Sequence, residues 1–343
     1  MGLDILCKQA MEEPNLDVLT ELRKYCYPPG IYFGLDADHY HADPAIGGTA
    51  IVKIRRDLRG WQLHTWMTPI DERLAYDDET TATILGTALH MIVLEGIDRF
   101  MRHYVRRPPD KDDATQAEKM ALTKAVKATL NDRIMLRHDE YDLCLRAAQR
   151  ITEHPKLRKS LEGGENEVSV FWIDTTGIPC KARFDRLKPH GIGDIKTIAN
   201  QYGARLATEC MWTIKRRRYD LQAAHYLIAR SVMPTLIKQG AVNTVSTATL
   251  EQMRAQEKLL SDITKTQNYA FQFIFLQKSQ ASVWSQNLSP ENPMIVNAME
   301  DRAHALETLA QMFAEYGARP WPETWELGEL HSEDMPGGEY GWD

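Results

Sequence analysis

The chain has 343 residues, of which 43% are hydrophobic and 26% are charged, and its formal net charge is -7. These proportions are those of an ordinary globular protein that can bury a substantial core, in one large domain or two small ones. The sequence contains no run of about 18 apolar residues, which argues against a membrane span. The negative charge argues against a protein that coats nucleic acid indiscriminately, although local basic clusters are compatible with a DNA enzyme.

Residues 1–27 predict a helical extension, because apolar and charged positions recur at helical spacing until a Pro-Pro-Gly break at residues 28–30. The N-terminal stretch lacks a basic start followed by an apolar core, which is the pattern of a secretory signal. We therefore expect a cytoplasmic protein.

A buried helix is predicted after Glu79, because apolar residues there recur at positions i, i+3 and i+4. It carries His90, one turn after Gly86, and this glycine would let another backbone or a metal centre come close. A lone histidine on an apolar helix is more often a satisfied core residue than a metal ligand. The acids and the lysine further along the chain favour the ligand interpretation.

Residues 108–160 predict a helical insertion that covers one side of a sheet, with helices at about 116–130 and 139–153. Two glycines end the insertion, and residues 167–174 then predict a strand. Glu167, at the start of this strand, is a possible additional acid of a site. The alternative for Glu167 is a solvated strand end.

Two strand-like runs, residues 178–187 and 192–198, flank a Lys-Pro-His-Gly turn and predict a hairpin. Side chains alternate along a strand, so Asp194 and Lys196 share one face. A turn of this length can bring Asp185, on the first strand, beside Asp194.

Paired carboxylates repel each other in a partly buried site unless a cation neutralises them. Magnesium prefers oxygen ligands, keeps several waters, and can make one of these waters nucleophilic at neutral pH. Lys196 would then lie within reach of that water or of a scissile phosphate. The alternative is a solvated hairpin with an ordinary Asp-x-Lys charge pair, a pattern that is frequent by chance.

Helices are predicted at residues 200–219 and 221–233. Gln222 and Tyr226 are four residues apart on the second helix and therefore share a face. A basic run just upstream could contact a phosphate backbone, and it consists of Lys215, Arg216, Arg217 and Arg218. The alternative is a core helix with a solvated basic end.

The C-terminal part predicts a helix at residues 249–262, a hairpin of residues 269–277 and 281–288 that extends the sheet, and a helix at residues 294–316. Residues 326–343 are acidic and rich in Pro and Gly, and they predict a flexible tail.

These features occur in the order of the motifs of the PD-(D/E)xK nuclease superfamily, and the chain resembles its RecB-like branch. LGTALH (85–90) resembles the first motif, a helix with a metal-binding histidine, and FDR (184–186) and GDIKT (193–197) resemble the second and third. QAAHY (222–226) resembles the Q-x-x-x-Y helix. Flanking segments resemble the RecE-like, phage-type exodeoxyribonuclease VIII domain over residues 28–325, and they read PGIYF (29–33), YHADP (40–44) and GENE (164–167).

The resemblance implies an α/β PD-(D/E)xK core, with a mixed central sheet flanked by helices. It implies a magnesium-dependent exonuclease that degrades one strand of linear double-stranded DNA in the 5′→3′ direction and leaves 3′ single-stranded tails for an annealing recombinase. His90, Asp185, Asp194 and the Ile195 carbonyl would hold Mg²⁺, for which Mn²⁺ would substitute, and Lys196 would complete the catalytic set with the two aspartates.

In the same resemblance Gln222 and Tyr226 hold substrate DNA, and some family members that encircle DNA form homo-oligomeric rings. Some RecB-like relatives bind an iron–sulfur cluster through one upstream and three clustered downstream cysteines. We expect no such cluster here, because no cysteine follows Cys210. Two alternatives stay open: an endonuclease or single-strand-specific nuclease of the same fold, and a non-catalytic DNA-binding subunit.

Overall fold

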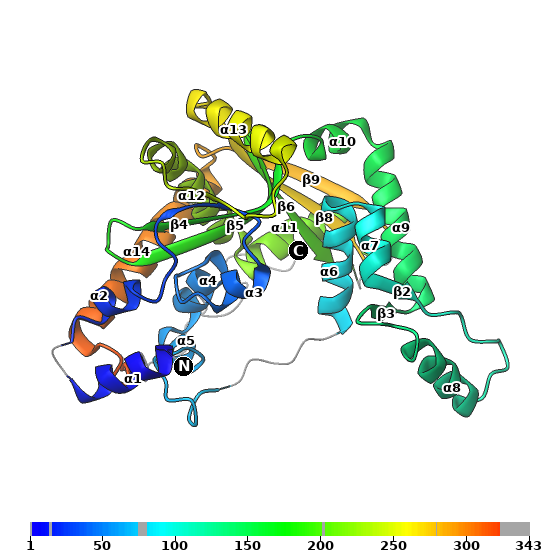
Figure 1. Ribbon diagram of the computed structural model, residues 1–343, viewed down its shortest axis with the longest axis horizontal. Coiled ribbons are helices and arrows are strands. Elements are labelled where there is room, and N and C mark those ends of the chain that lie inside the picture. The colour runs from blue at the N-terminus through cyan, green and yellow to red at the C-terminus, as the bar shows by residue number, and fades with distance from the viewer. Residues whose placement is uncertain (1, 14–15, 75–80, 201–202, 279, 323–343) are drawn as a thin grey trace, which may run out of the picture.

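The computed structural model describes residues 2–13, 16–74, 81–200, 203–278 and 280–322, so the tail predicted for residues 326–343 lies outside the described residues. Its main strands are β1 (Gly30–Phe33), β4 (Glu165–Ile173), β5 (Pro179–Lys188), β6 (Gly191–Ile198), β7 (Val242–Thr244), β8 (Ala270–Gln277) and β9 (Val283–Leu288). They form a 7-stranded sheet in the order β7-β1-β4-β5-β6-β8-β9 (Figure 1).

The sheet is mixed, as predicted. β7 pairs with β1 and β6 pairs with β8 in parallel, and the other neighbours are antiparallel. Both predicted hairpins, β5 with β6 and β8 with β9, are confirmed. The parallel pairing of β6 with β8 joins the two hairpins and makes β6 a central strand.

Both faces of the sheet are buried, and β8 shows this most clearly. Phe271, Phe273 and Phe275 belong to one core cluster, whereas Ile274 and Leu276 belong to a second cluster on the opposite face. Side chains alternate along a strand, so a strand covered on both faces is apolar at nearly every position. This explains why β8 reads as an unbroken apolar run.

Helices cover both faces of the sheet (Figure 1). The first cluster includes residues of α1 (Gly2–Glu12), α2 (Val18–Arg23), α4 (Gly48–Arg56), α5 (Leu58–Leu63), α11 (Leu206–Arg217), α12 (Tyr219–Lys238), α13 (Leu250–Lys265) and α14 (Pro293–Tyr316). The second includes residues of α6 (Thr81–Leu94), α7 (Ile97–His103), α9 (His138–Glu153) and α10 (Pro155–Leu161). Each helix in the described part of the chain is too short or too polar to cross a membrane.

The predicted insertion covers the sheet only in part. Its second predicted helix, α9, packs on α6 and β9, but its first, α8 (Gln116–Lys127), buries none of its residues and projects from the body (Figure 1). Periodicity also did not predict a small parallel sheet in which β3 (Ile134–Leu136) of the insertion pairs with β2 (Tyr104–Arg106), which lies just before the insertion. Strands of three residues are too short to show an alternating pattern.

The boundary between α11 and α12 falls at Arg218, close to the predicted one. Arg218 adopts a left-handed conformation (φ 52, ψ 44), which an L-residue other than glycine rarely adopts. Its guanidinium bonds to Asp220 at 3.1 Å and to Asp301 of α14 at 2.5 Å, and these contacts hold the turn in place. α12 starts at this turn and runs across the face of the sheet.

Candidate active site

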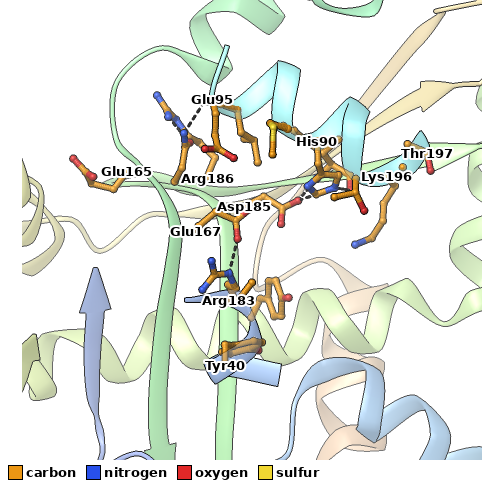
Figure 2. A pocket seen from close by; sticks show the side chains of 18 of the residues that line it. Tyr40, His90, Glu95, Glu165, Glu167, Arg183, Asp185, Arg186, Lys196 and Thr197 are labelled. Atoms are coloured by element: carbon orange, nitrogen blue, oxygen red, sulfur yellow. Dashed lines mark hydrogen bonds and ion pairs between the residues drawn. The ribbon is translucent and has the colours of Figure 1, made fainter. Parts of the chain in front are cut away.

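A cavity of about 1770 Å³ opens over the middle of the sheet. Its walls come from α3 (Ala37–Ala42), α6, the strands β4, β5 and β6, α11, α12 and α13. Most of the residues singled out in the sequence lie on these walls. Figure 2 shows four of them from close by, His90, Glu167, Asp185 and Lys196.

β5 and β6 separate where the site begins. Their backbone pairing ends at Arg186 with Gly193, one step before Asp185 would face Asp194. Beyond that pair the Oδ2 atom of Asp185 accepts the backbone N–H of Ile195 at 2.7 Å. A carboxylate therefore takes the place of a strand carbonyl, and this bond fixes Asp185 at the point where the strands diverge.

His90 reaches this point from α6 on the covering layer. Its Nε2 atom lies 2.7 Å from the Ile195 carbonyl oxygen and 3.6 Å from the Oδ2 atom of Asp185 (Figure 2). His90, Asp185 and the Ile195 carbonyl, three of the four predicted metal ligands, therefore lie close together, although they come from segments about 100 residues apart. One imidazole nitrogen, one carboxylate and one backbone carbonyl converge on one position.

Glu167 joins this group from β4. Its carboxylate, the His90 nitrogen and an Asp185 oxygen all lie within 4.8 Å of one another, an arrangement that could hold a metal ion. Glu167 has a φ of 53, which is rare for a glutamate in a strand, and such conformations cluster at functional sites. Arg183 bonds to the Glu167 carboxylate and balances its charge (Figure 2). The geometry therefore favours the site interpretation of Glu167 over a solvated strand end.

Asp194 occupies a different position from the one expected of a metal ligand. Its side chain is 1% exposed, and its carboxylate lies 2.7 Å from the Lys196 Nζ atom. Among the described residues, the cavity wall includes Lys196 but not Asp194. The Lys196 ammonium donates to the Oδ1 atom of Asp194 at 2.9 Å and lies 2.7 Å from its Oδ2 atom, so both carboxylate oxygens face this lysine. Metal binding by Asp194 stays a prediction.

The charged side chains of the site shift one another's pKa values. Burial raises the pKa of Asp185 to about 6, although His90 opposes this effect, and the Asp194 carboxylate adds to it. Burial lowers the pKa of Lys196, but the Asp194 and Asp185 carboxylates outweigh it and raise that pKa overall. A divalent cation beside Asp185 would relieve the cost of its buried charge.

The donor set fits a divalent metal ion. Carboxylate and carbonyl oxygens suit magnesium and manganese, and an imidazole nitrogen suits iron, nickel, copper and zinc. The open cavity beside His90 and Asp185 leaves room for waters on such an ion. The site residues are therefore compatible with both predicted ions, Mg²⁺ and Mn²⁺, and do not distinguish between them.

A family model described as a PDDEXK-like domain of unknown function (DUF3799) matches residues 67–282, which is more than half of the chain. The chain belongs to this PDDEXK-like family. The match confirms that the chain belongs to the predicted PD-(D/E)xK superfamily. This superfamily has a nuclease-type fold, and its enzymes typically use divalent metal ions. No curated protein matches the chain.

The PDDEXK-like region contains both residues of the predicted Q-x-x-x-Y helix, α12. The Gln222 Nε2 atom donates to the Tyr226 hydroxyl at 3.2 Å, so the two side chains share a face as predicted. Tyr226 lines the cavity but is only 8% exposed, and its ring packs against Phe184 and Phe271. The Tyr226 ring is part of the hydrophobic core, and its hydroxyl faces the site. DNA binding by Gln222 and Tyr226 stays a prediction.

The four residues of the basic run differ in their surroundings. Arg216 and Arg217 line the cavity, and Arg216 also bonds to Glu209 at 2.5 Å. Lys215 lies over the ring of Trp212, and Arg218 holds the turn between α11 and α12. Only the middle two arginines are therefore placed to meet a ligand inside the cavity.

In the described part of the chain, no other backbone packs closely against Gly86. A Cβ atom at this position would meet the Thr197 hydroxyl at an ordinary 3.5 Å. A close approach of a metal centre to Gly86 stays a prediction. The sequence analysis assigned no role to the cavity residues Arg183 and Lys278, because their relevance depends on segments that fold together.

Proposed function

We propose that the protein is a magnesium-dependent DNA exonuclease. It would degrade one strand of linear double-stranded DNA from the 5′ end and leave 3′ single-stranded tails for an annealing recombinase in the cytoplasm. The convergence of His90, Asp185, the Ile195 carbonyl and Lys196 on one cavity wall carries the proposal of metal-dependent hydrolysis. The polarity, the recombinase and a ring-shaped oligomer rest on the resemblance to RecE-like exonucleases.

Each residue has a role that its position supports. A bound Mg²⁺ supplies a nucleophilic water at neutral pH and offsets charge on a phosphate oxygen. His90, Asp185 and the Ile195 carbonyl would hold the ion, with Glu167 as a further acid. Lys196 would donate a hydrogen bond to the attacking water or to a phosphate oxygen, because its ammonium is held at the cavity wall by Asp194.

The size and charge of the cavity support a polymeric substrate. Small-molecule sites usually enclose about 300–1,000 Å³, whereas this cavity measures about 1770 Å³. Arg56, Arg216, Arg217 and Lys278 lie on its walls and supply positive charge for a phosphate backbone. An anionic polymer would bind along these positively charged residues, although the net charge of the chain is -7.

The test is digestion of linear duplex DNA that carries a label at either the 5′ or the 3′ end. We expect magnesium and manganese to support stepwise loss of the 5′-labelled strand, EDTA to stop it, and calcium to support little turnover because its loose coordination positions water poorly. Covalently closed circular DNA should stay intact, since an exonuclease cannot start on it.

Cleavage of the closed circle would support the endonuclease alternative instead. Binding of DNA by the folded protein without any magnesium-stimulated cleavage would support a non-catalytic subunit. Loss of the 3′-terminal label first would overturn the proposed polarity and leave metal-dependent hydrolysis in place.

A further inference from the structure

We infer that the exposed face of α11 is a stacking site for an unpaired base of a DNA strand, with Trp212 as the platform. The inference rests on the proposed function and adds a contact for a single strand at the rim of the cavity. No motif in the sequence pointed to Trp212.

Two large apolar side chains of α11 are exposed at consecutive positions. Met211 is 63% exposed and Trp212 is 49% exposed. A single exposed apolar residue is common on protein surfaces and needs no explanation. Tryptophan is different because its flat ring offers a large stacking surface, and stacking on an aromatic ring is how proteins hold unpaired bases without reading their sequence.

Helix geometry places Trp212 at the edge of the cavity. Glu209, Thr213 and Arg216 of α11 line the cavity. Successive residues of a helix are rotated by about 100°, so Trp212 lies between the side of the helix that carries Arg216 and the solvent side that carries Lys215. A strand that leaves the cavity past Arg216 would pass over the Trp212 ring.

Cations surround the platform. The Lys215 Nζ atom lies 6.0 Å from the centre of the Trp212 ring, and Arg216 and Arg217 lie on the cavity side. Arg56 donates to the backbone carbonyl of Arg216 at 2.6 Å and adds positive charge at the same end of the helix. Aromatic rings combined with cations that follow the backbone are the pattern of single-strand binding.

This charge distinguishes a nucleic acid from a second copy of the chain. A two-fold dimer built on this face would bring α11 against its own copy and place Lys215 near an identical cation, with the Arg216–Glu209 pair beside it. A polyanion neutralises the same charges. The helix is also firmly seated, because Cys210 is 0% exposed and Ile214 is 4% exposed, so the platform is held in position before a base arrives.

The test separates base stacking from backbone contact. Binding of a fluorescent oligothymidylate and of an abasic strand of equal length is measured in calcium, for the wild type, Trp212→Ala and Trp212→Phe. We expect Trp212→Ala to weaken binding of the oligothymidylate by about 5- to 100-fold, the scale of one aromatic stacking contact. The abasic strand should bind equally to all three proteins, and Trp212→Phe should retain most of the affinity.

Met120→Ala on α8 is the matched control, since Met120 is 65% exposed on a helix outside the cavity wall. It should bind both strands like the wild type. Equal losses for the two strands in Trp212→Ala, or no loss for either, would overturn the inference. A change in the mass of Trp212→Ala in solution would also overturn it and identify the face as an interface between copies.

Cleavage of linear duplex by the wild type is measured on the same preparations. A wild type that shows base-dependent binding through Trp212 but no magnesium-dependent cleavage would refute the proposed function and keep the stacking site. A wild type that cleaves duplex normally, with no base-dependent effect at Trp212, would refute the stacking site alone. Melting curves confirm that each variant is folded.

Discussion

The carboxylates of Asp185 and Asp194 have different surroundings, although they lie on neighbouring strands. Asp185 faces the cavity and accepts a backbone N–H, whereas Asp194 lies against Lys196 beneath the wall. Glu167, predicted as a possible additional acid, lies beside His90 and Asp185, and metal binding by Asp194 stays a prediction. Substitutions of the two aspartates should therefore have different effects on stability.

Asp185→Asn should abolish cleavage and leave the protein as stable as the wild type or more stable. The amide oxygen can still accept the Ile195 N–H, while a buried charge is removed. Asp194→Asn should also abolish cleavage but destabilise the fold, by up to about 3–5 kcal/mol, because the Lys196 ammonium stays buried without its partner. Magnesium-dependent cleavage and denaturant unfolding measure the two effects. Activity above a tenth of wild type in either variant would contradict its proposed role.

Lys196→Ala should lower the single-turnover cleavage rate by about 10²–10³-fold, the usual effect of losing one such electrostatic group. DNA affinity in calcium should change far less. Lys258→Ala is the matched control, because Lys258 makes an exposed pair with Asp262 at 3.0 Å and such pairs contribute about 0–1 kcal/mol. A near-normal rate in Lys196→Ala, or a loss explained entirely by weaker binding, would refute the catalytic role.

A second buried network lies behind the site, around His225 of α12. Its Nε2–H donates to the Lys181 carbonyl at 3.0 Å, and its Nδ1 atom accepts from the Arg302 guanidinium at 3.1 Å. Arg302 in turn pairs with Asp174 at 2.6 Å. Protonation of His225 would place two cations face to face, and burial together with Arg302 lowers its pKa to about 3.

This depressed pKa predicts a dependence of stability on pH. An unfolded histidine titrates near pH 6.5, so the contribution of neutral His225 is complete above that pH and is lost as the pH falls toward 3. The slope attributable to His225 is about 1.4 kcal/mol per pH unit in this window. His225→Gln can donate and accept without titrating and should remove that slope from denaturant unfolding curves. Equal slopes in the two proteins would show that His225 titrates normally.

At the scale of elements, the turn between α11 and α12 separates arginines that are adjacent in sequence. Arg217 lines the cavity, whereas Arg218 links α12 and α14 through Asp220 and Asp301. The basic run therefore combines an arginine at the cavity wall with one that holds the turn.

Arg217→Ala should weaken duplex binding in calcium and reduce the slope of log affinity against log salt by about 1, because one phosphate contact is lost. Its melting temperature should stay unchanged. Arg218→Ala should lower the melting temperature and leave the slope of log affinity against log salt near normal. Anisotropy titrations over a salt series and melting curves distinguish the variants, and the opposite assignment of the two effects would contradict the geometry.

At the scale of the whole molecule, the N-terminal helices share the main core. Leu6, Val18 and Leu22 are at most 3% exposed and belong to the first cluster. Arg23 also donates to the Gly177 carbonyl at 2.6 Å, between β4 and β5. The predicted boundary between an extension and the domain at residue 27 stays a prediction, and the packing provides a way to test it.

Deletion of residues 1–27 should strongly destabilise the protein. Each fully buried aliphatic side chain contributes about 1.5–3 kcal/mol, and the truncation also exposes the apolar surface that these side chains cover. Thermal unfolding followed by near-ultraviolet circular dichroism should show a much lower midpoint or no cooperative transition. A truncated protein that melts like the full chain would show that the extension is an independent segment.

The sequence by itself determined the local elements and the order of the site residues. Both hairpins, α6 with His90 and α12 with Gln222 and Tyr226 follow from periodicities of 2 and 3.6 residues and from turn residues, which act over a few positions. Only the tertiary structure decided that Glu167 joins His90 and Asp185, and that Asp194 lies under Lys196. Such neighbours are set by sheet order and by where β5 and β6 diverge, and packing between distant segments leaves no periodic signal in the chain.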